Sequence, residues 1–209
     1  MKETTRIEAF SDGVFAIAIT LLILDIHVPD PEPNTSLIKA MLAEWTSMLA
    51  LLIGFFTILI CWINHHYMFQ MINKSNSKLL LVNGFKLLVV TITPFSTALL
   101  SKHLASEWCQ SAINIYTFNF ALMGIAMTSV WCYAYLNGFV KVESNEVLRA
   151  VTQLYIFASL SSTTIWIVSF FSIPACLILS ALMFLIFIFP EKIVKWRVGK
   201  IKREISEVV

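Results

Sequence analysis

Three groups of polar residues interrupt the apolar segments of this sequence, and they are the first candidates for chemistry. One group stands where an apolar run begins and consists of Arg6, Ser11 and Asp12. The members of the other two groups are Trp62, Asn64, His65 and His66, followed by Asn83 and Lys86. Polar side chains are costly inside a membrane and mark a functional site by default. They could form a hydrogen-bonded contact between helices, a proton relay or a metal site.

These three kinds of chemistry are not equally well supported. Polar residues between membrane helices often only fix the packing of those helices. His65 and His66 are adjacent and point about 100° apart on a helix, whereas two ligands of one metal usually stand four residues apart. We therefore expect no metal. A proton relay through Asp12, His65 and His66, as in a proton-coupled secondary transporter, stays open, although the inverted repeat common in such transporters is not visible.

The composition indicates what kind of protein carries these residues. The chain has 209 residues, of which 58% are hydrophobic and 13% charged, and its mean hydropathy is +0.78. Soluble domains average roughly 45–50% apolar and about 25% charged residues. The net charge of +2 is too small to indicate nucleic-acid binding. These values exclude a disordered chain and an ordinary cytosolic enzyme. The enzyme motifs G-x-S-x-G and H-E-x-x-H are also missing, so no enzyme is expected.

Apolar runs long enough for membrane helices fill most of the chain. A spanning helix needs about 20 apolar residues. The runs predict six spans, at residues 10–28, 45–69, 79–100, 112–136, 148–171 and 173–189. The fold class is therefore an all-α integral membrane protein, with residues 1–190 as the transmembrane domain and residues 191–209 as a basic tail.

The distribution of positive charge predicts the orientation in the membrane. With six spans, both termini and two of the connections share one side. The basic residues on that side are Lys2, Arg6, Lys74, Lys78, Lys141, Arg149 and the cluster in residues 191–209, against Lys39 and Lys102 opposite. Basic residues collect on the cytoplasmic side, so both termini are expected in the cytoplasm of a cell-membrane protein. The tail suits a position near anionic lipid, or equally a solvated helix end.

The first predicted helix carries an apolar stripe. At 100° per residue, Ile17, Leu21 and Leu24 fall within an arc of about 60°. Phe10 and Val28 lie on the same stripe, and Thr20 borders it. The stripe by itself predicts packing against neighbouring helices or lipid.

The start of this helix resembles a known family. The residues Arg6, Phe10, Ser11 and Asp12 form the pattern R-x-x-x-F-S-D, which resembles the signature of the transmembrane protein 175 family. The residues that extend the likeness are Trp62, Asn64, His65, Asn83 and Pro94. The likeness is strong over the first three predicted spans and rests on hydropathy alone in the last three.

This resemblance implies a function. Prokaryotic members are potassium channels in which one six-helix chain assembles as a homotetramer and the first helix lines a central pore. Position by position, it implies a constriction at Ile17, further apolar layers at Leu21 and Leu24, and a filter-region threonine at Thr20. The polar network that fixes the pore helix would contain Arg6, Phe10, Ser11, Asp12, Trp62, Asn64, His65 and Asn83. Lys86 is not typical of the family, and its role is left open.

A channel of this kind would conduct monovalent cations without a cofactor. An isoleucine ring cannot replace the hydration shell of an ion as carbonyl oxygens do, so we expect a leak-type channel with modest selectivity for potassium over sodium. Hydrophobic constrictions of this kind can gate by dewetting.

Overall fold

The computed structural model is almost entirely helical and describes residues 4–25, 36–142 and 144–206. The helices are α1 (Thr5–Leu21), the 3-10 turn η1 (Leu22–Asp25), α2 (Leu37–Ala43), α3 (Trp45–Met71), α4 (Ser77–His103), α5 (Cys109–Leu136), α6 (Asn145–Ser169), α7 (Ile173–Phe187) and α8 (Pro190–Ser206). A β-bridge joins Ile72 to Val140.

Within the described ranges, five helices are long and apolar enough to cross a membrane, namely α1 with η1 and α3 to α6. The 15 residues of α7 extend about 22 Å, which is less than the roughly 30 Å of a bilayer core. The chain then bends by 79° into α8, so α7 and α8 count together as a possible sixth span.

Five of the six predicted spans correspond to these five helices, and the sixth, at residues 173–189, corresponds to α7, which reaches the length of a span only together with α8. Several ends differ. α1 begins at Thr5 rather than at residue 10, and the predicted end of the first span, Val28, lies outside the described residues. The last span is predicted to end at residue 189, whereas the helix α7 ends two residues earlier, at Phe187. The short helix α2 and the helix α8 were not predicted, because neither is apolar over the length of a span.

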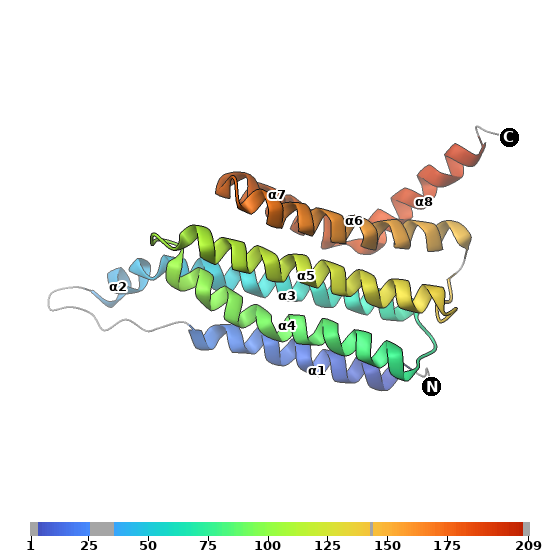
Figure 1. Ribbon diagram of the computed structural model, residues 1–209, viewed down its shortest axis with the longest axis horizontal. Helices are drawn as coiled ribbons and strands as arrows, with labels where there is room; N and C mark the ends of the chain where they lie inside the picture. Colours follow the sequence, from blue (N-terminus) through green and yellow to red (C-terminus); the bar gives the residue numbers. More distant parts are fainter. Residues whose placement is uncertain (1–3, 26–35, 143, 207–209) are drawn as a thin grey trace.

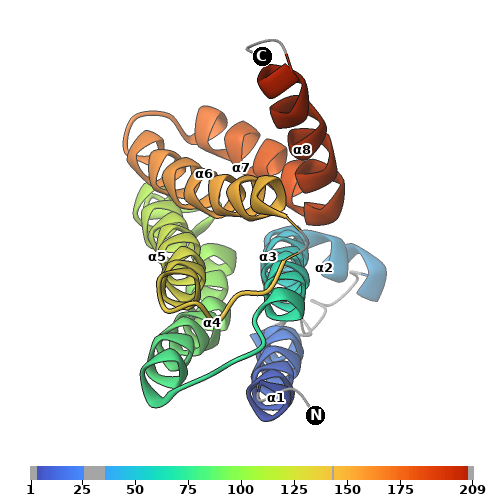
Figure 2. The ribbon, with the colours of Figure 1, turned by 90° about the vertical axis from the view of Figure 1, so that its right-hand side faces the viewer.

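Consecutive long helices run antiparallel, and α3 packs against α1, α4, α5 and α7 while another of its faces stays exposed (Figures 1 and 2). α1 lies at one edge, against α3 and α4, and α5 and α6 form the opposite side. The start of α1, the α3–α4 and α5–α6 connections, and α8 all lie at one end of the molecule (Figure 1). Most of the basic residues therefore gather at that end, as the charge pattern predicts.

Side-chain caps mark where the helices begin. Asn76 Oδ1 accepts a hydrogen bond from the backbone N–H of Leu79, 2.8 Å away, at the start of α4. Ser144 and Ser172 cap α6 and α7 in the same way, and Pro174 occupies the first turn of α7, where its missing N–H costs nothing. These caps keep the connections short, so successive helices pack side by side.

Candidate functional site

The helix α1 has one buried face and one open face. The buried side chains are Ile7, Ser11, Phe15 and Ala18, with Leu22 just beyond the end of the helix. The opposite side exposes large apolar side chains: Phe10 is 67% exposed, Ile17 61%, Leu21 43% and Leu24 73%. α1 lies at the edge of the bundle, so nothing in the described chain covers this open face (Figure 2). The predicted stripe is therefore an apolar surface available to other molecules.

Two side-chain hydrogen bonds hold the middle of α1 on its neighbours. The indole Nε1 of Trp62 on α3 donates to Asp12 Oδ1 at 2.8 Å. The amide Nδ2 of Asn83 on α4 donates to the buried Ser11 Oγ at 3.1 Å. Ser11 and Asp12 thus bond different helices, and the two contacts together fix both the depth and the rotation of α1.

A buried lysine lies directly behind α1. Lys86 of α4 is fully buried, and its Nζ lies 2.6 Å from Nδ1 of His65 on α3. The same nitrogen lies 5.4 Å from the ring centre of Phe15 and 5.6 Å from that of Phe69. An ammonium group has only donors, so His65 must accept at Nδ1 and is then a neutral imidazole. Lys86 is therefore held by one hydrogen bond and two aromatic faces.

Thr20, which borders the stripe, is exposed on the open side of α1. Its Oγ1 donates to the carbonyl oxygen of Ile17 at 2.9 Å, within the same helix. Because the hydroxyl proton of Thr20 is used in this bond, the oxygen lone pairs remain free to accept or to approach a cation. Thr20 therefore presents an oxygen next to the apolar Ile17 and Leu21.

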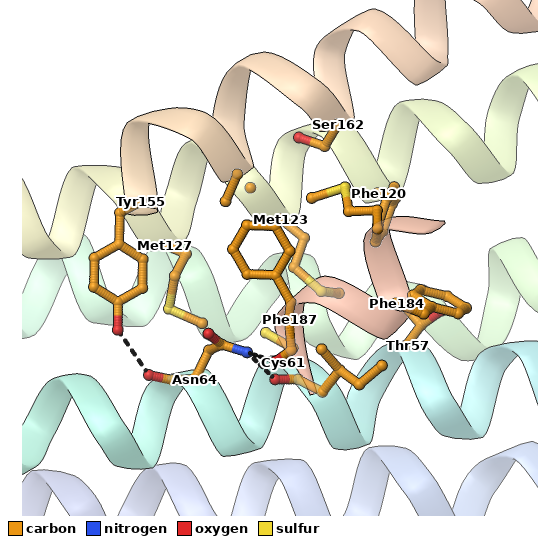
Figure 3. A pocket seen from close by; sticks show the side chains of 14 residues that line it. Thr57, Cys61, Asn64, Phe120, Met123, Met127, Tyr155, Ser162, Phe184 and Phe187 are labelled. Carbon is orange, nitrogen blue, oxygen red and sulfur yellow. Dashed lines mark hydrogen bonds between the residues drawn. The ribbon is translucent and has the colours of Figure 1, made fainter. Parts of the chain in front are cut away.

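Asn64 lies elsewhere in the bundle. Its Nδ2 donates to the carbonyl oxygens of Ile60 and Phe187, both at 2.8 Å, so it joins α3 to α7. Its Oδ1 has no hydrogen-bond partner in the described part of the chain. The residue borders a mostly apolar cavity of about 60 Å³ between α3, α5, α6 and α7 (Figure 3). The hydrogen bonds of Asn64 thus do not reach α1.

The remaining candidates lie at the surface. His66 is exposed, stacks on Trp62 with ring centres 5.8 Å apart, and pairs with Gln70. Arg6 and Phe10 are exposed beside an open groove between α1 and the start of α4 that also contains Asn83. The structure therefore brings together Ser11 with Asn83, Asp12 with Trp62, and His65 with Lys86.

Comparison with known proteins identifies the family. A family model described as the endosomal/lysosomal potassium channel TMEM175 matches residues 6–94, which contain all of these candidate residues. A crystal structure described as a lysosomal potassium-selective channel TMEM175 homolog from Chamaesiphon minutus matches with a TM-score of 0.79 and 34% identity, over 88% of this chain and 96% of that one. This chain belongs to the TMEM175 family.

Several named relatives match over only part of their length. A protein from Chamaesiphon minutus named a potassium channel is 45% identical over 116 residues, which are 54% of this chain and 57% of that protein. Human TMEM175, named an endosomal/lysosomal proton channel, is 39% identical over 99 residues, or 44% of this chain and 20% of the human protein. The chain thus spans about half the length of the bacterial relatives it matches.

TMEM175 membership agrees with the helical membrane fold and identifies a family of ion channels rather than enzymes. It does not favour the proton-coupled transporter. Asp12 is bonded to Trp62 and His65 to Lys86, and no hydrogen bond among the described residues links Asp12, His65 and His66 into a relay.

The sequence pattern did not indicate Phe15 and Phe69. Both are apolar residues in apolar runs, and only the fold places their rings against the ammonium group of Lys86. The spacing of Ser11 and Phe15, four residues apart on α1, is the one signal that puts Phe15 on the buried face.

Proposed function

We propose that this protein is a potassium channel formed by four copies of the chain, with α1 of each copy at a central pore. The observation that carries the proposal is the open apolar face of α1, where Ile17 and Leu24 are more than half exposed, whereas the opposite face with Phe15 and Ala18 is buried. An open apolar face on a membrane helix is available to lipid or to other helices, and we assign it to the α1 helices of the neighbouring copies. The potassium-channel names of the bacterial relatives support the same reading.

In this assembly, the stripe would form successive rings around the axis. Leu21 lies about 6 Å beyond Ile17 along α1, and Leu24, reached through the 3-10 turn η1, lies about 6 Å beyond Leu21. Four isoleucines at the first ring make an apolar constriction that gates by dewetting. The oxygen of Thr20 lies beside this constriction and offers a polar contact to a partly dehydrated cation.

The polar residues behind the stripe would act as positioning residues. The bonds from Trp62 to Asp12 and from Asn83 to Ser11 set the rotation of α1. Successive side chains of a helix point about 100° apart, so a rotation of α1 about its own axis would turn the side chain of Ile17 away from the pore axis. We assign His65 and Lys86 to the same support, because Phe15 packs on both.

We also propose that the end of the molecule that contains α8 faces the cytoplasm of a bacterial cell. Lys74 and Lys141 lie in the connections at that end, Lys78 lies in the first turn of α4, and α8 adds further basic residues. Lys39 of α2 lies at the other end (Figure 1). This distribution follows the positive-inside rule. Residues 1–190 form the channel domain and residues 191–209 the basic tail in this proposal.

Proton conduction is a second candidate, because human TMEM175 is named a proton channel. The bacterial relative named a potassium channel aligns over more of this chain and at higher identity. Potassium is therefore the favoured ion, and the test must distinguish the two.

The direct test uses purified protein in liposomes loaded with potassium chloride and diluted into a medium without potassium. With a protonophore present, potassium efflux draws in protons, which a pH-sensitive dye reports. Vesicles loaded with sodium measure selectivity, and vesicles with valinomycin but no protonophore measure proton conduction through the protein itself. We expect dye quenching with potassium well above that with sodium. Quenching no greater than in protein-free vesicles, from protein shown to be tetrameric, would contradict the proposal.

A further inference from the structure

A large groove lies at the basic end of the molecule, away from α1. Its walls come from α8, the last turns of α3 and the connection into α6, and its volume is about 980 Å³. Three lysines line it: Lys141 before α6, and Lys195 and Lys202 on α8. Glu191 is the one carboxylate among the described lining residues. The groove therefore has an excess of positive charge.

The groove is preformed by contacts that do not involve the side chains of its lysines. On α8, Val194 and Ile201 are buried, and Arg197 Nε donates to Gln153 Oε1 of α6 at 2.9 Å. The backbone N–H of Lys141 donates to the carbonyl oxygen of Met71 at 2.8 Å and ties the connection to α3. A ligand would thus meet a fixed arrangement of charges, which reduces the entropy lost on binding.

The other lining residues are apolar as well as polar. Met71, Val194 and Val198 contribute hydrocarbon surface, whereas Tyr67 and Gln70 contribute groups able to donate hydrogen bonds. A small inorganic anion would leave the apolar part of a groove of this size unused. An anion attached to hydrocarbon would use both parts.

The position of the groove points to the membrane surface. α7 is too short to cross a bilayer core alone, and α8 leaves it at an angle of 79°. α8 thus runs nearly perpendicular to α7, and its surface carries basic side chains with Trp196, 63% exposed, among them. Basic residues and tryptophan are typical of a helix at the lipid–water interface.

We propose that this groove binds the phosphate-bearing headgroup of an anionic membrane lipid. The ammonium groups of Lys141, Lys195 and Lys202 would contact the phosphate, and the apolar wall would contact the glycerol and the first methylene groups of the acyl chains. The inference concerns binding alone and does not depend on ion conduction.

Native mass spectrometry of the full-length protein in detergent tests this site. Phosphatidylglycerol and phosphatidylcholine are added separately, and the apparent dissociation constant of each first-bound lipid is measured. We expect the wild-type protein to prefer phosphatidylglycerol. In the double variant Lys195→Gln/Lys202→Gln, we expect affinity for phosphatidylglycerol to fall roughly 25-fold, or roughly fivefold for each lysine near the lipid surface. Affinity for phosphatidylcholine should change little.

The matched control is the double variant Lys192→Gln/Lys200→Gln, which removes the same charge from the same helix outside the groove lining. It should keep the preference of the wild type. Equal losses of phosphatidylglycerol affinity in both variants would overturn the proposal, because binding would then depend on the total charge of α8. No loss of affinity in either variant would overturn it as well, because binding would then not involve the lysines of α8. Soluble glycerol phosphate distinguishes the source of the anion. Displacement of the lipid by glycerol phosphate at an equal concentration would also overturn the assignment to lipid.

Discussion

Lys86 and His65 form a buried pair, with Nζ of the lysine 2.6 Å from Nδ1 of the histidine. The two residues come from α4 and α3, and the rings of Phe15 on α1 and Phe69 on α3 cover the lysine. The histidine supplies the one hydrogen-bond acceptor that the described residues offer to Lys86 Nζ. Because Lys86 depends on His65 for this acceptor, removing the histidine and removing the lysine should have unequal effects on stability.

We predict that His65→Leu destabilises the protein far more than Lys86→Met. Leucine leaves the ammonium group buried without an acceptor, and breaking a buried pair in this way costs about 3–5 kcal/mol. Methionine removes the charge and leaves only a neutral acceptor unpaired, which costs about 1–3 kcal/mol and is offset by the charge no longer being buried. Thermal unfolding in detergent measures both. Equal melting temperatures for the two variants would refute this description of the pair.

The contact between α5 and α6 depends on Gly124. A Cβ atom at this position would lie 2.3 Å from Ser162 Oγ and 3.2 Å from the carbonyl oxygen of Ala158. Gly124→Ala should therefore force the helices apart and lower the melting temperature, with a cost of about 1–3 kcal/mol, typical of overpacking. Gly199→Ala on α8 is the control, because nothing lies within 4 Å of its Cβ position. That variant should be as stable as the wild type or slightly more stable. A Gly124→Ala variant with unchanged melting would show that the two helices are not in this close contact.

The bond between Trp62 and Asp12 can be isolated by a double-mutant cycle. The variants are Trp62→Phe, Asp12→Ala and the two combined, and Trp196→Phe controls for the loss of an indole group. A hydrogen bond to a carboxylate should give a coupling free energy of about 1 kcal/mol or more. If the changes in unfolding free energy of the two single variants add up to that of the double variant, the two side chains do not interact in the assembled protein.

Thr20 should contribute to selectivity through its oxygen. We predict that Thr20→Val, which keeps the shape and removes the oxygen, lowers the ratio of potassium to sodium permeability. Thr20→Ser keeps a hydroxyl group able to make the bond to Ile17 and should keep the ratio. Reversal potentials under bi-ionic conditions measure this. If valine and serine give the same ratio as threonine, the hydroxyl group has no part in selectivity.

The sequence predicts the long helices well because each is a run of apolar residues bounded by caps or charges. The predicted start of the second span coincides with the first residue of α3, Trp45. The predicted end of the fourth span coincides with the last residue of α5, Leu136. The same signal misses α2 and α8. α8 is amphipathic, and its place depends on the contact of Arg197 with Gln153, which no local pattern predicts.

The candidate site was predictable only in part. The stripe on α1 follows from helical periodicity alone, and the structure shows that its described members are exposed together. The partners of the polar residues depend on how α1, α3 and α4 are rotated. Asn64 and His65 are adjacent in sequence, yet one bonds α7 and the other bonds α4. Adjacent helix residues point about 100° apart, so proximity in sequence cannot assign both to one network.

The central claim is that Ile17 lies at the narrowest part of a pore lined by α1. The most direct measurement is single-channel recording of Ile17→Asn in planar bilayers beside the wild type. Leu160→Asn is the control, because it places the same polar group on an exposed apolar position of α6, a helix that does not pack on α1. A polar ring would wet the constriction, so we predict a higher unitary potassium conductance in Ile17→Asn and wild-type conductance in Leu160→Asn. Unchanged conductance in Ile17→Asn, from protein that is folded and tetrameric, would contradict the placement of Ile17 in the pore.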